Sequence, residues 1–232
     1  MDFRIDPKYG EVDADVKAFL WLFDERPGTP ILSIGDNEEY SANILTDNGY
    51  GVTGMDLRPW LQSVPCNHVH LTQDLMDYAK NCDGLCQPSP LHKCVYSLSA
   101  VEHFGLTTYG DRDFEYQDAV AMNAIWRILR HGGTCYVTVP YGRYFMSCGT
   151  HWRIYDQRAL QSRIVQKFKV EKAAFFTSAV AHIDRTAYSL GTELDKSIAD
   201  KYEGTDPHVT VILKMRKDIY AKRRQDILID RR

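Results

Sequence analysis

The chain has 232 residues, of which 44% are apolar, and its 28 basic and 31 acidic side chains give a net charge of −3 at pH 7. This composition is typical of a folded globular protein and excludes disordered, collagen-like and coiled-coil chains. The longest apolar run, residues 18–23, is far below the roughly 18 residues of a bilayer crossing, and no secretory signal is visible, so we expect a cytoplasmic protein without a membrane segment.

The predicted elements begin with a helix over residues 12–23, which ends at the prolines and glycine of residues 24–30. Short strands then alternate with helices. Strands are predicted at 31–34, 51–55, 69–72, 94–98 and 134–139, and helices at 39–48 and 114–130. The longest helix repeats apolar pairs every four residues, and Gly132 and Gly133 are predicted to cap its end.

The remaining elements are a helix at 156–165, a strand at 168–176, a helix at 192–202 and an alternating strand at 208–215. Alternating helices and short β-branched strands predict right-handed βαβ units and a parallel sheet covered on both faces. No repeat, linker or composition break divides the chain, so residues 1–232 are predicted to form a single domain.

Ligands of open α/β sheets bind beyond the carboxyl ends of the strands. Gly35, after the first strand, allows the backbone to turn sharply and approach a ligand closely. Asp56 follows the second strand about 20 residues later, where a carboxylate can accept hydrogen bonds from the ribose hydroxyls of a nucleoside. This spacing occurs in nicotinamide enzymes and in methyltransferases, so it does not decide between these cofactors.

The first loop separates the two cofactors better. A dinucleotide fold needs several glycines so that backbone amides can meet a pyrophosphate, whereas this loop has Gly35 followed by Asp36, Asn37, Glu38 and Glu39. Its carboxylates would repel a pyrophosphate and favour a cofactor that carries an ammonium and a sulfonium, namely S-adenosylmethionine. Glu38 and Glu39 are equally explained as acidic residues in the first turn of a helix.

Cysteines and histidines gather between residues 66 and 94. The set consists of Cys66, His68, His70, Cys82, Cys86, His92 and Cys94. Structural zinc sites usually contain two tight ligand pairs, and only Cys82 and Cys86 form one. We therefore predict reduced thiols in loops and no metal.

The segments 31–38, 51–56, 97–105 and 126–140, in this order, resemble those of the class I S-adenosylmethionine-dependent methyltransferases. Within that superfamily, the resemblance extends through residues 102–111, 140–142 and 151–155 to small bacterial-type enzymes often associated with surface-sugar and secondary-metabolite pathways. It implies a Rossmann-like, doubly wound α/β fold with a mostly parallel seven-stranded sheet and an antiparallel last hairpin. Residues 31–142 would form the cofactor-binding half, and residues 143–232 the substrate-facing loop and C-terminal strands. The single glycine of the first loop departs from the usual two or three.

The resemblance also implies the cofactor-binding residues. Gly35 would meet the methionine end, Asp56 the ribose, Asp74 the adenine amino group, and residues 97–99 the floor near the sulfonium. The complete expected set is Gly35, Asp36, Asn37, Asp56, Leu57, Asp74, Leu75, Ser97, Leu98 and Ser99.

Methyl transfer is an in-line displacement that needs a positioned nucleophile and no metal. A hydroxyl nucleophile benefits from a base, and histidine suits that role near neutral pH. His103 follows the fourth strand and His151 lies in the loop after the fifth, so both are candidate bases, with Asp111 a candidate to orient the base or bind a sugar hydroxyl.

Residues expected to face the substrate are rich in tyrosine and arginine, and the loop 141–155 is a candidate lid. The predicted substrate contacts are Glu102, Tyr109, Tyr141, Arg143, Arg153 and Tyr155. Rings that stack and groups that hydrogen-bond suit a polyhydroxylated or aromatic acceptor. Glu102 is equally explained as a structural residue.

The sequence therefore predicts an enzyme that methylates a hydroxyl of a small molecule, with a sugar or sugar-like metabolite as the favoured class and an amine as the second choice. A catalytically weak, methyltransferase-like binding protein and an NAD-dependent oxidoreductase remain as alternatives. Nucleic acid is not an expected partner, because the positive charge gathers in the last residues, 214–232, rather than over a broad face. A homo-oligomer is left open.

Overall fold

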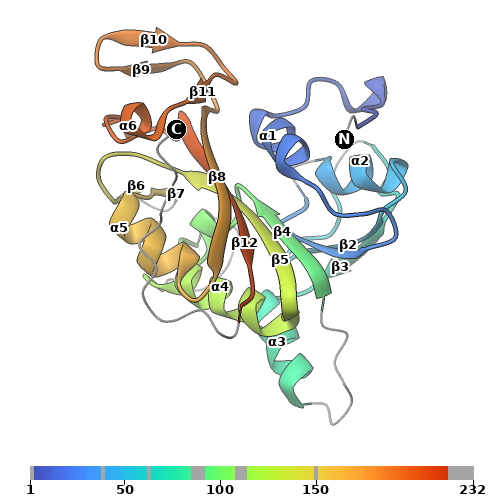
Figure 1. The fold of residues 1–232 in the computed structure, drawn as a ribbon. Coiled ribbons are helices and arrows are strands. Elements are labelled where there is room, and N and C mark those ends of the chain that lie inside the picture. The colour runs from blue at the N-terminus through green and yellow to red at the C-terminus, as the bar shows by residue number, and fades with distance from the viewer. Residues whose placement is uncertain are drawn as a thin grey trace.

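The fold is built on an eight-stranded mixed sheet with the strand order β11-β8-β12-β5-β4-β1-β2-β3 (Figure 1). The computed structural model describes residues 3–37, 40–61, 64–84, 92–107, 114–148 and 151–218. The strands of this sheet are β1 (Pro30–Ile34), β2 (Gly51–Asp56), β3 (Val69–Thr72), β4 (His92–Leu98), β5 (Leu129–Pro140), β8 (Lys169–Thr177), β11 (Glu193–Leu194) and β12 (Val209–Arg216). The strands from β5 to β3 run parallel, and β12 is antiparallel to both β5 and β8.

Helices cover both faces of the sheet, with α1 and α2 on one side and α3, α4 and α5 on the other (Figure 1). The helices are α1 (Ala14–Leu22), α2 (Ser41–Asp47), α3 (Leu75–Gly84), α4 (Gln117–Ile128), α5 (Gln157–Ala159) and α6 (Lys196–Ala199), with 3₁₀ turns η1 (Pro7–Tyr9) and η2 (Val101–His103) and the π-helical η3 (Leu160–Val165). In the part of the chain that the structure describes, no helix combines the length and apolar character of a membrane span.

Two hydrophobic cores follow from this layering. Phe19 of α1 and Ile44 of α2 pack against Tyr96 of β4 on one face, whereas Ile125 of α4 packs against Val137 of β5 on the other. All five of these side chains are buried. The strands are nearly continuous apolar runs because they are covered on both sides, as the sequence pattern predicts.

The predicted doubly wound fold is thus confirmed, with eight strands instead of seven. The additional strand, β11, lies in the segment 192–202 that was predicted as a helix. Glu193 and Leu194 pair with the edge of β8, and only α6 keeps the helical conformation. Backbone pairing at an open sheet edge outweighs the local helix preference in this segment.

The boundary between α4 and β5 also differs from the prediction. The helix begins at Gln117 instead of 114 and ends at Ile128 instead of 130, because Leu129 already pairs with His92 of β4. Gly132 has a φ of 71°, and its N–H donates to the Lys217 carbonyl at 2.9 Å. The glycine pair therefore forms an irregularity within the strand rather than a helix cap.

The structure contains three further features that were not predicted from the sequence. Helix α3 was not predicted, although buried Leu75 and Ala79 lie one helical turn apart. The candidate lid forms a hairpin of β6 (Met146–Cys148) and β7 (Trp152–Ile154), and β9 (Ala181–Ile183) pairs with β10 (Thr186–Tyr188).

Candidate active site

A cavity of about 700 Å³ lies at the carboxyl ends of the parallel strands. This is the place where open α/β sheets bind ligands, and the volume suits a small molecule or nucleoside. Its lining comes from the segment before α1, the ends of β1, β2 and β4, the start of α3, and the segment after β8. The lining residues are Glu11, Val12, Asp13, Ala14, Asp15, Ile34, Gly35, Met55, Asp56, Leu57, Arg58, Gln73, Asp74, Leu75, Leu98, Ser99, Ala100, His103, Phe104, Ser178 and Leu190.

Most of the expected cofactor residues line this cavity. Those that do are Gly35, Asp56, Leu57, Asp74, Leu75, Leu98 and Ser99. Asp36, Asn37 and Ser97 are buried residues of the described chain and lie outside the lining. The expected residues that line the cavity thus lie at or just after the ends of strands or at the start of α3, whereas Asp36 and Asn37, further along the loop after β1, do not line it.

Gly35 ends β1 with a φ of 75°, a conformation that residues with a side chain rarely adopt. Its N–H donates to the Met55 carbonyl at 2.8 Å, which joins it to β2. A Cβ added to Gly35 would lie 2.4 Å from the Cβ of Ala100, so the glycine is needed for close packing of the ends of β1 and β4. Gly35 also lines the cavity, and its predicted close approach to a ligand stays a prediction.

The side chains of Asp36 and Asn37 lie toward the connection between β2 and β3 and outside the cavity lining, and their predicted part in cofactor binding stays a prediction. The Asn37 amide donates to the Pro59 carbonyl at 2.6 Å and accepts from the Leu61 N–H at 2.9 Å. Asp36 contacts His68 instead. Gly35 thus has left-handed backbone, and the two side chains that follow it contact the segment between β2 and β3. Glu38 and Glu39 lie outside the described residues.

Asp56 and Asp74 supply carboxylates from two neighbouring segments. Asp56 accepts from the backbone N–H of Arg58 at 2.9 Å and from its Nε at 3.0 Å, so a ribose would share the carboxylate with this guanidinium. Asp74 Oδ1 accepts from the Asp77 N–H at 3.0 Å and so caps the start of α3. Both residues remain in the lining of the cavity.

Asp15 is a cavity residue that the sequence reading missed. It lies in the first turn of α1 and is only 6% exposed. Its Oδ2 accepts from the Thr138 hydroxyl at 3.0 Å, and this hydroxyl accepts from the Ser99 N–H at 2.8 Å. Burial, aided by the negative charge of Glu102, raises the pKa of Asp15 to about 7. The helix was predicted from its apolar pattern, and nothing in the sequence indicated that its acidic residue Asp15 would line the cavity.

Ser99 and Glu102 continue the same network. Ser99 has a φ of 47°, which is unusual for a residue with a side chain and marks strained backbone at the end of β4. Its hydroxyl donates to Glu102 Oε1 at 2.8 Å. Glu102 is buried, and burial raises the pKa of its carboxyl. Glu102 therefore holds Ser99, which lines the cavity, and is not itself one of the lining residues.

The two histidines predicted as bases lie close together, but they differ in their position relative to the cavity. His103 lines the cavity, and its Nδ1 donates to the backbone carbonyl of His151. Its Nε2 lies 4.0 Å from Glu102 Oε1. The His151 side chain is exposed and is not among the residues that line the cavity. Asp111 and Tyr109, also predicted here, lie outside the described residues.

The other predicted substrate residues take part in packing. Arg153 is buried and donates to the carbonyls of Glu102 at 3.1 Å and Phe104 at 2.7 Å. Tyr141 is buried and donates to Asp200 at 2.6 Å, and Tyr155 is buried and donates to Asp118 at 2.7 Å. Arg143 is exposed and pairs with Glu203. The described members of this set lie outside the cavity, because residues that follow β5 turn back onto the sheet.

The cavity is strongly acidic. Glu11, Asp13, Asp15, Asp56 and Asp74 contribute carboxyl groups, whereas the guanidinium of Arg58 is paired with one of them. Such a lining attracts a cation and disfavours a pyrophosphate. Among the described residues, the carboxyl groups of this lining come from outside the first loop.

The predicted cysteine and histidine set is divided by the fold. Cys66, His68 and His70 lie beside Asp36, whereas His92 bonds to Tyr78 at 2.8 Å. The described cysteines, Cys66, Cys82, Cys94 and Cys135, are free thiols, and Cys86 lies outside the described residues.

No family model and no curated protein matches the sequence. Solved structures share the fold at low identity. A SAM-dependent methyltransferase from Methanosarcina mazei has a TM-score of 0.51 and 10% identity over 84% of this chain and 94% of that one. The 1,6-didemethyltoxoflavin-N1-methyltransferase of Burkholderia thailandensis, bound to S-adenosylhomocysteine, has a TM-score of 0.52 and 10% identity over 88% of this chain and 76% of that one.

A third similar structure is the [4+2]-cyclase SpnF, with a TM-score of 0.57 and 12% identity over 88% of this chain and 80% of that one. The shared architecture therefore accompanies more than one named activity. Together with the strand order and the position of the cavity, these likenesses show that the chain has the fold of the class I S-adenosylmethionine-dependent methyltransferases.

Proposed function

We propose that the protein is an S-adenosylmethionine-dependent methyltransferase that acts on a hydroxyl of a small molecule. The observation that carries the proposal is the acidic cavity at the carboxyl ends of β1, β2 and β4 in a fold of this type. S-adenosylmethionine supplies an electrophilic methyl group and carries an ammonium and a sulfonium, which the carboxylates would attract. The same lining disfavours NAD, whose pyrophosphate it would repel.

The residues around the cavity fit the parts of this cofactor. Asp56 would accept hydrogen bonds from the ribose, and Asp74 from the adenine amino group, with the apolar side chains of Leu57 and Leu75 beside the base. Asp15 would face positive charge from the side of α1. This assignment uses the lining residues and leaves out Asp36 and Asn37, whose side chains turn away.

His103 is the residue that we propose as the base. Its Nδ1 must carry a proton, because the His151 carbonyl can only accept, so the neutral ring has its lone pair at Nε2. Glu102, 4.0 Å from Nε2, would stabilise the ring after it takes a proton from the acceptor hydroxyl. His151 then acts through its backbone, and its own imidazole has no part in the reaction.

The acceptor is proposed to be a sugar or sugar-like metabolite, with an amine as the second choice. Carboxylates accept hydrogen bonds from sugar hydroxyls, and an aromatic ring packs on a sugar face, so Glu11, Asp13 and Phe104 of the lining support this class. The toxoflavin enzyme, by its name a methyltransferase acting at nitrogen, supports a small-molecule acceptor in general.

Cofactor binding is tested by isothermal titration calorimetry with S-adenosylmethionine, S-adenosylhomocysteine and NAD⁺. We expect the first two to bind and NAD⁺ not to bind, and we expect Asp56→Ala to weaken binding at least about 10-fold. Asp77→Ala, which removes an exposed charge of α3, is the matched control and should bind normally. Binding of NAD⁺ alone would refute the proposal.

Catalysis is tested by transfer of a labelled methyl group to a panel of sugars, phenols and amines. We expect His103→Gln to lower the rate constant about 100-fold or more with cofactor affinity retained, and His151→Gln to leave the rate nearly unchanged. Equal losses in both variants would contradict the assignment of the base. Cofactor binding without transfer to any acceptor would instead favour the binding-protein alternative.

A further inference from the structure

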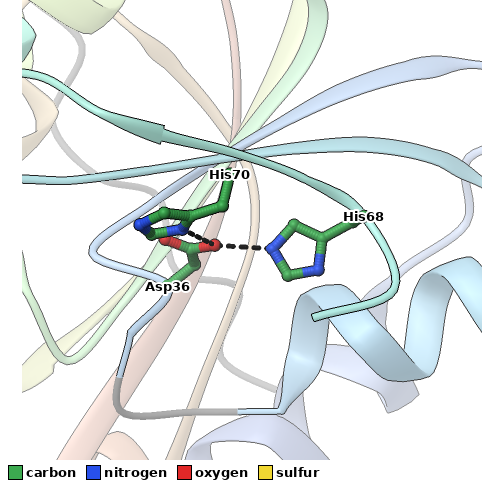
Figure 2. Close-up of side chains that lie close together, drawn as sticks. All are labelled: Asp36, His68 and His70. Carbon is green, nitrogen blue, oxygen red and sulfur yellow. Dashed lines mark hydrogen bonds and ion pairs between the residues drawn. The ribbon is translucent and has the colours of Figure 1, made fainter. Parts of the chain in front are cut away.

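Asp36, His68 and His70 converge beside β3, outside the acidic cavity (Figure 2). His68 directly precedes β3 and His70 lies within it, and both side chains reach Asp36. Asp36 reaches them from the loop after β1. Asp36 Oδ2 lies 2.8 Å from His68 Nε2 and 3.3 Å from His70 Nδ1, and the three candidate ligand atoms lie within 4.8 Å of one another.

Gly54 provides the space for this cluster. It lies in β2, between the two strands that carry the cluster, and pairs with His70. A Cβ at this position would lie 1.6 Å from Asp36 Oδ2 and 2.7 Å from His68 Nε2. Glycine in a strand interior usually marks a close approach of other groups. The sheet is therefore built around the convergence of these side chains.

The outer nitrogen of each ring is held by an acceptor of fixed orientation. His68 Nδ1 lies 2.8 Å from Asn43 Oδ1, and the Asn43 amide nitrogen is directed to the Pro65 carbonyl at 3.2 Å. His70 Nε2 lies 3.0 Å from the Arg58 carbonyl. Each outer nitrogen thus carries the proton, so a neutral ring directs its lone pair at Asp36. Metal-bound histidines are held in this way, with the second nitrogen donating to a carbonyl or carboxylate.

The cluster is buried and contains an unsatisfied acceptor. The side chains of His68 and His70 are 0% and 10% exposed, and both rings approach the same oxygen of Asp36. Asp36 Oδ1 is buried and has no partner among the described residues. A cation held between the carboxylate and the two rings would give these groups a common partner.

We propose that Asp36, His68 and His70 bind a divalent transition-metal ion of the Zn²⁺ type. Two imidazoles and one carboxylate suit Zn²⁺ better than Mg²⁺ or Ca²⁺, which prefer oxygen ligands. Ligand atoms around a tetrahedral Zn²⁺ are about 3.3 Å apart. The separation of Asp36 Oδ2 from His70 Nδ1 equals this value, and its separation from His68 Nε2, 2.8 Å, is shorter, so binding would move the carboxylate and the His68 ring slightly apart. Trp60 contacts both rings in a T-shaped arrangement, and the rings are almost fully buried, which favours a structural ion.

The ion would join segments that form one side of the acidic cavity. Asp36 follows Gly35 directly, and His70 contacts the carbonyl of Arg58, whose side chain bonds to Asp56. The described part of the connection between β2 and β3 contains no helix, so a metal would give this connection the stability that a packed helix provides in most βαβ units. The site does not depend on the activity proposed above.

The test is metal analysis of the whole protein by inductively coupled plasma mass spectrometry, followed by titration of chelator-treated protein with Zn²⁺ and Co²⁺. We expect about one equivalent of metal per chain, a rise in the melting temperature with Zn²⁺, and visible Co²⁺ bands typical of nitrogen and oxygen ligands. Quenching of Trp60 fluorescence by Co²⁺ would place the ion beside the two rings.

Variants show whether these residues hold the ion. His70→Ala should lower Zn²⁺ affinity at least about 100-fold, and Asn43→Ala about 10-fold to 100-fold through loss of ring orientation. His92→Gln, which changes a half-buried histidine bonded to Tyr78, should bind Zn²⁺ like the parent chain. The proposal is overturned if the chelator-treated parent chain, shown to be folded by circular dichroism, takes up no Zn²⁺ or Co²⁺, or if His70→Ala binds Zn²⁺ as tightly as His92→Gln.

Discussion

Replacing Asp15 by asparagine should stabilise the protein at neutral and alkaline pH. The carboxyl group of Asp15 is buried at the start of α1, close to the buried Glu102, and accepts a hydrogen bond from the Thr138 hydroxyl. Asparagine has nearly the same shape, carries no charge at any pH, and can still accept the hydrogen bond from Thr138.

The size of the effect follows from the pKa of Asp15, which rises from 3.8 to about 7 on folding. Between these values the folded state holds a proton that the unfolded state has lost, so stability falls as the pH rises through this window and is constant above it. Each pH unit of the window costs about 1.4 kcal/mol, which gives an upper bound of about 4 kcal/mol near pH 8. Near pH 4 the cost is absent.

The measurement is urea unfolding of the parent chain and of Asp15→Asn at several values from about pH 4 to about pH 8. The stability difference between the two should grow steadily with pH in favour of the variant. Asp13→Asn removes an exposed charge two residues away and keeps a good helix-capping residue, so it controls for the general loss of negative charge. A difference independent of pH, or equal in both variants, would refute the reasoning.

Three other substitutions test the packing around the cavity. Gly35→Ala should cost about 2 kcal/mol or more, measured by urea unfolding, because it forces a side chain into left-handed backbone and against a neighbouring Cβ. Arg153→Met should lower the free energy of unfolding by about 3 kcal/mol in the same assay, because it leaves buried carbonyls unpaired. The exposed control, Arg143→Met, should lower it by less than about 1 kcal/mol. Equal losses of stability in the two variants would contradict this reasoning. Asp118→Ala should cost about 3–5 kcal/mol by leaving the Arg163 charge unpaired, and a double-mutant cycle should show that removing both partners costs less than the sum of the single changes.

Local patterns were sufficient to predict the parallel strands at the centre of the sheet. Residues 31–34, 51–55 and 69–72 lie within β1, β2 and β3, because buried parallel strands read as short apolar runs between turn residues. The cavity follows from the same pattern, since it lies where these strands end. Gly35, Asp56 and Asp74 were identifiable for that reason alone.

Residues beyond the strand ends could not be placed in this way. The direction of the Asp36 side chain depends on the left-handed turn at Gly35 and on the space above Gly54. Gly54 lies in β2, the strand before His68 and His70 in the sequence, and pairs with His70 in the sheet. The pairing of Leu129 with His92, likewise, is a contact between distant parts of the chain that outweighs a good local helix pattern. Neither is visible in the spacing of residues.

The buried arginine and tyrosines illustrate a further limit of reasoning from residue type. The segment after β5, which was predicted to face the substrate, contains Arg153, Tyr141 and Tyr155. Side chains of these types can stack on a sugar or form hydrogen bonds with it. In the fold they satisfy buried carbonyls and carboxylates instead, and burial raises the pKa of both tyrosines. Large polar side chains of this kind lie in cores wherever irregular backbone needs donors, so their number near a strand end does not by itself predict a binding surface.

The residues of the loop after β1 face two different places, although the acidic sequence of the loop suggested a single role in binding the cofactor. Gly35 faces the cavity, whereas Asp36 faces the two histidines on the opposite side of the same turn. The negative charge that would attract a cationic cofactor therefore comes from Asp56, Asp74 and the segment before α1. Because Asp15 is joined through the Thr138 hydroxyl to the end of β4, the segment that supplies this charge is also fixed to the sheet beneath it. The start of α1 thus contributes to the rigidity of the cavity, although the sequence pattern of this helix indicated only packing.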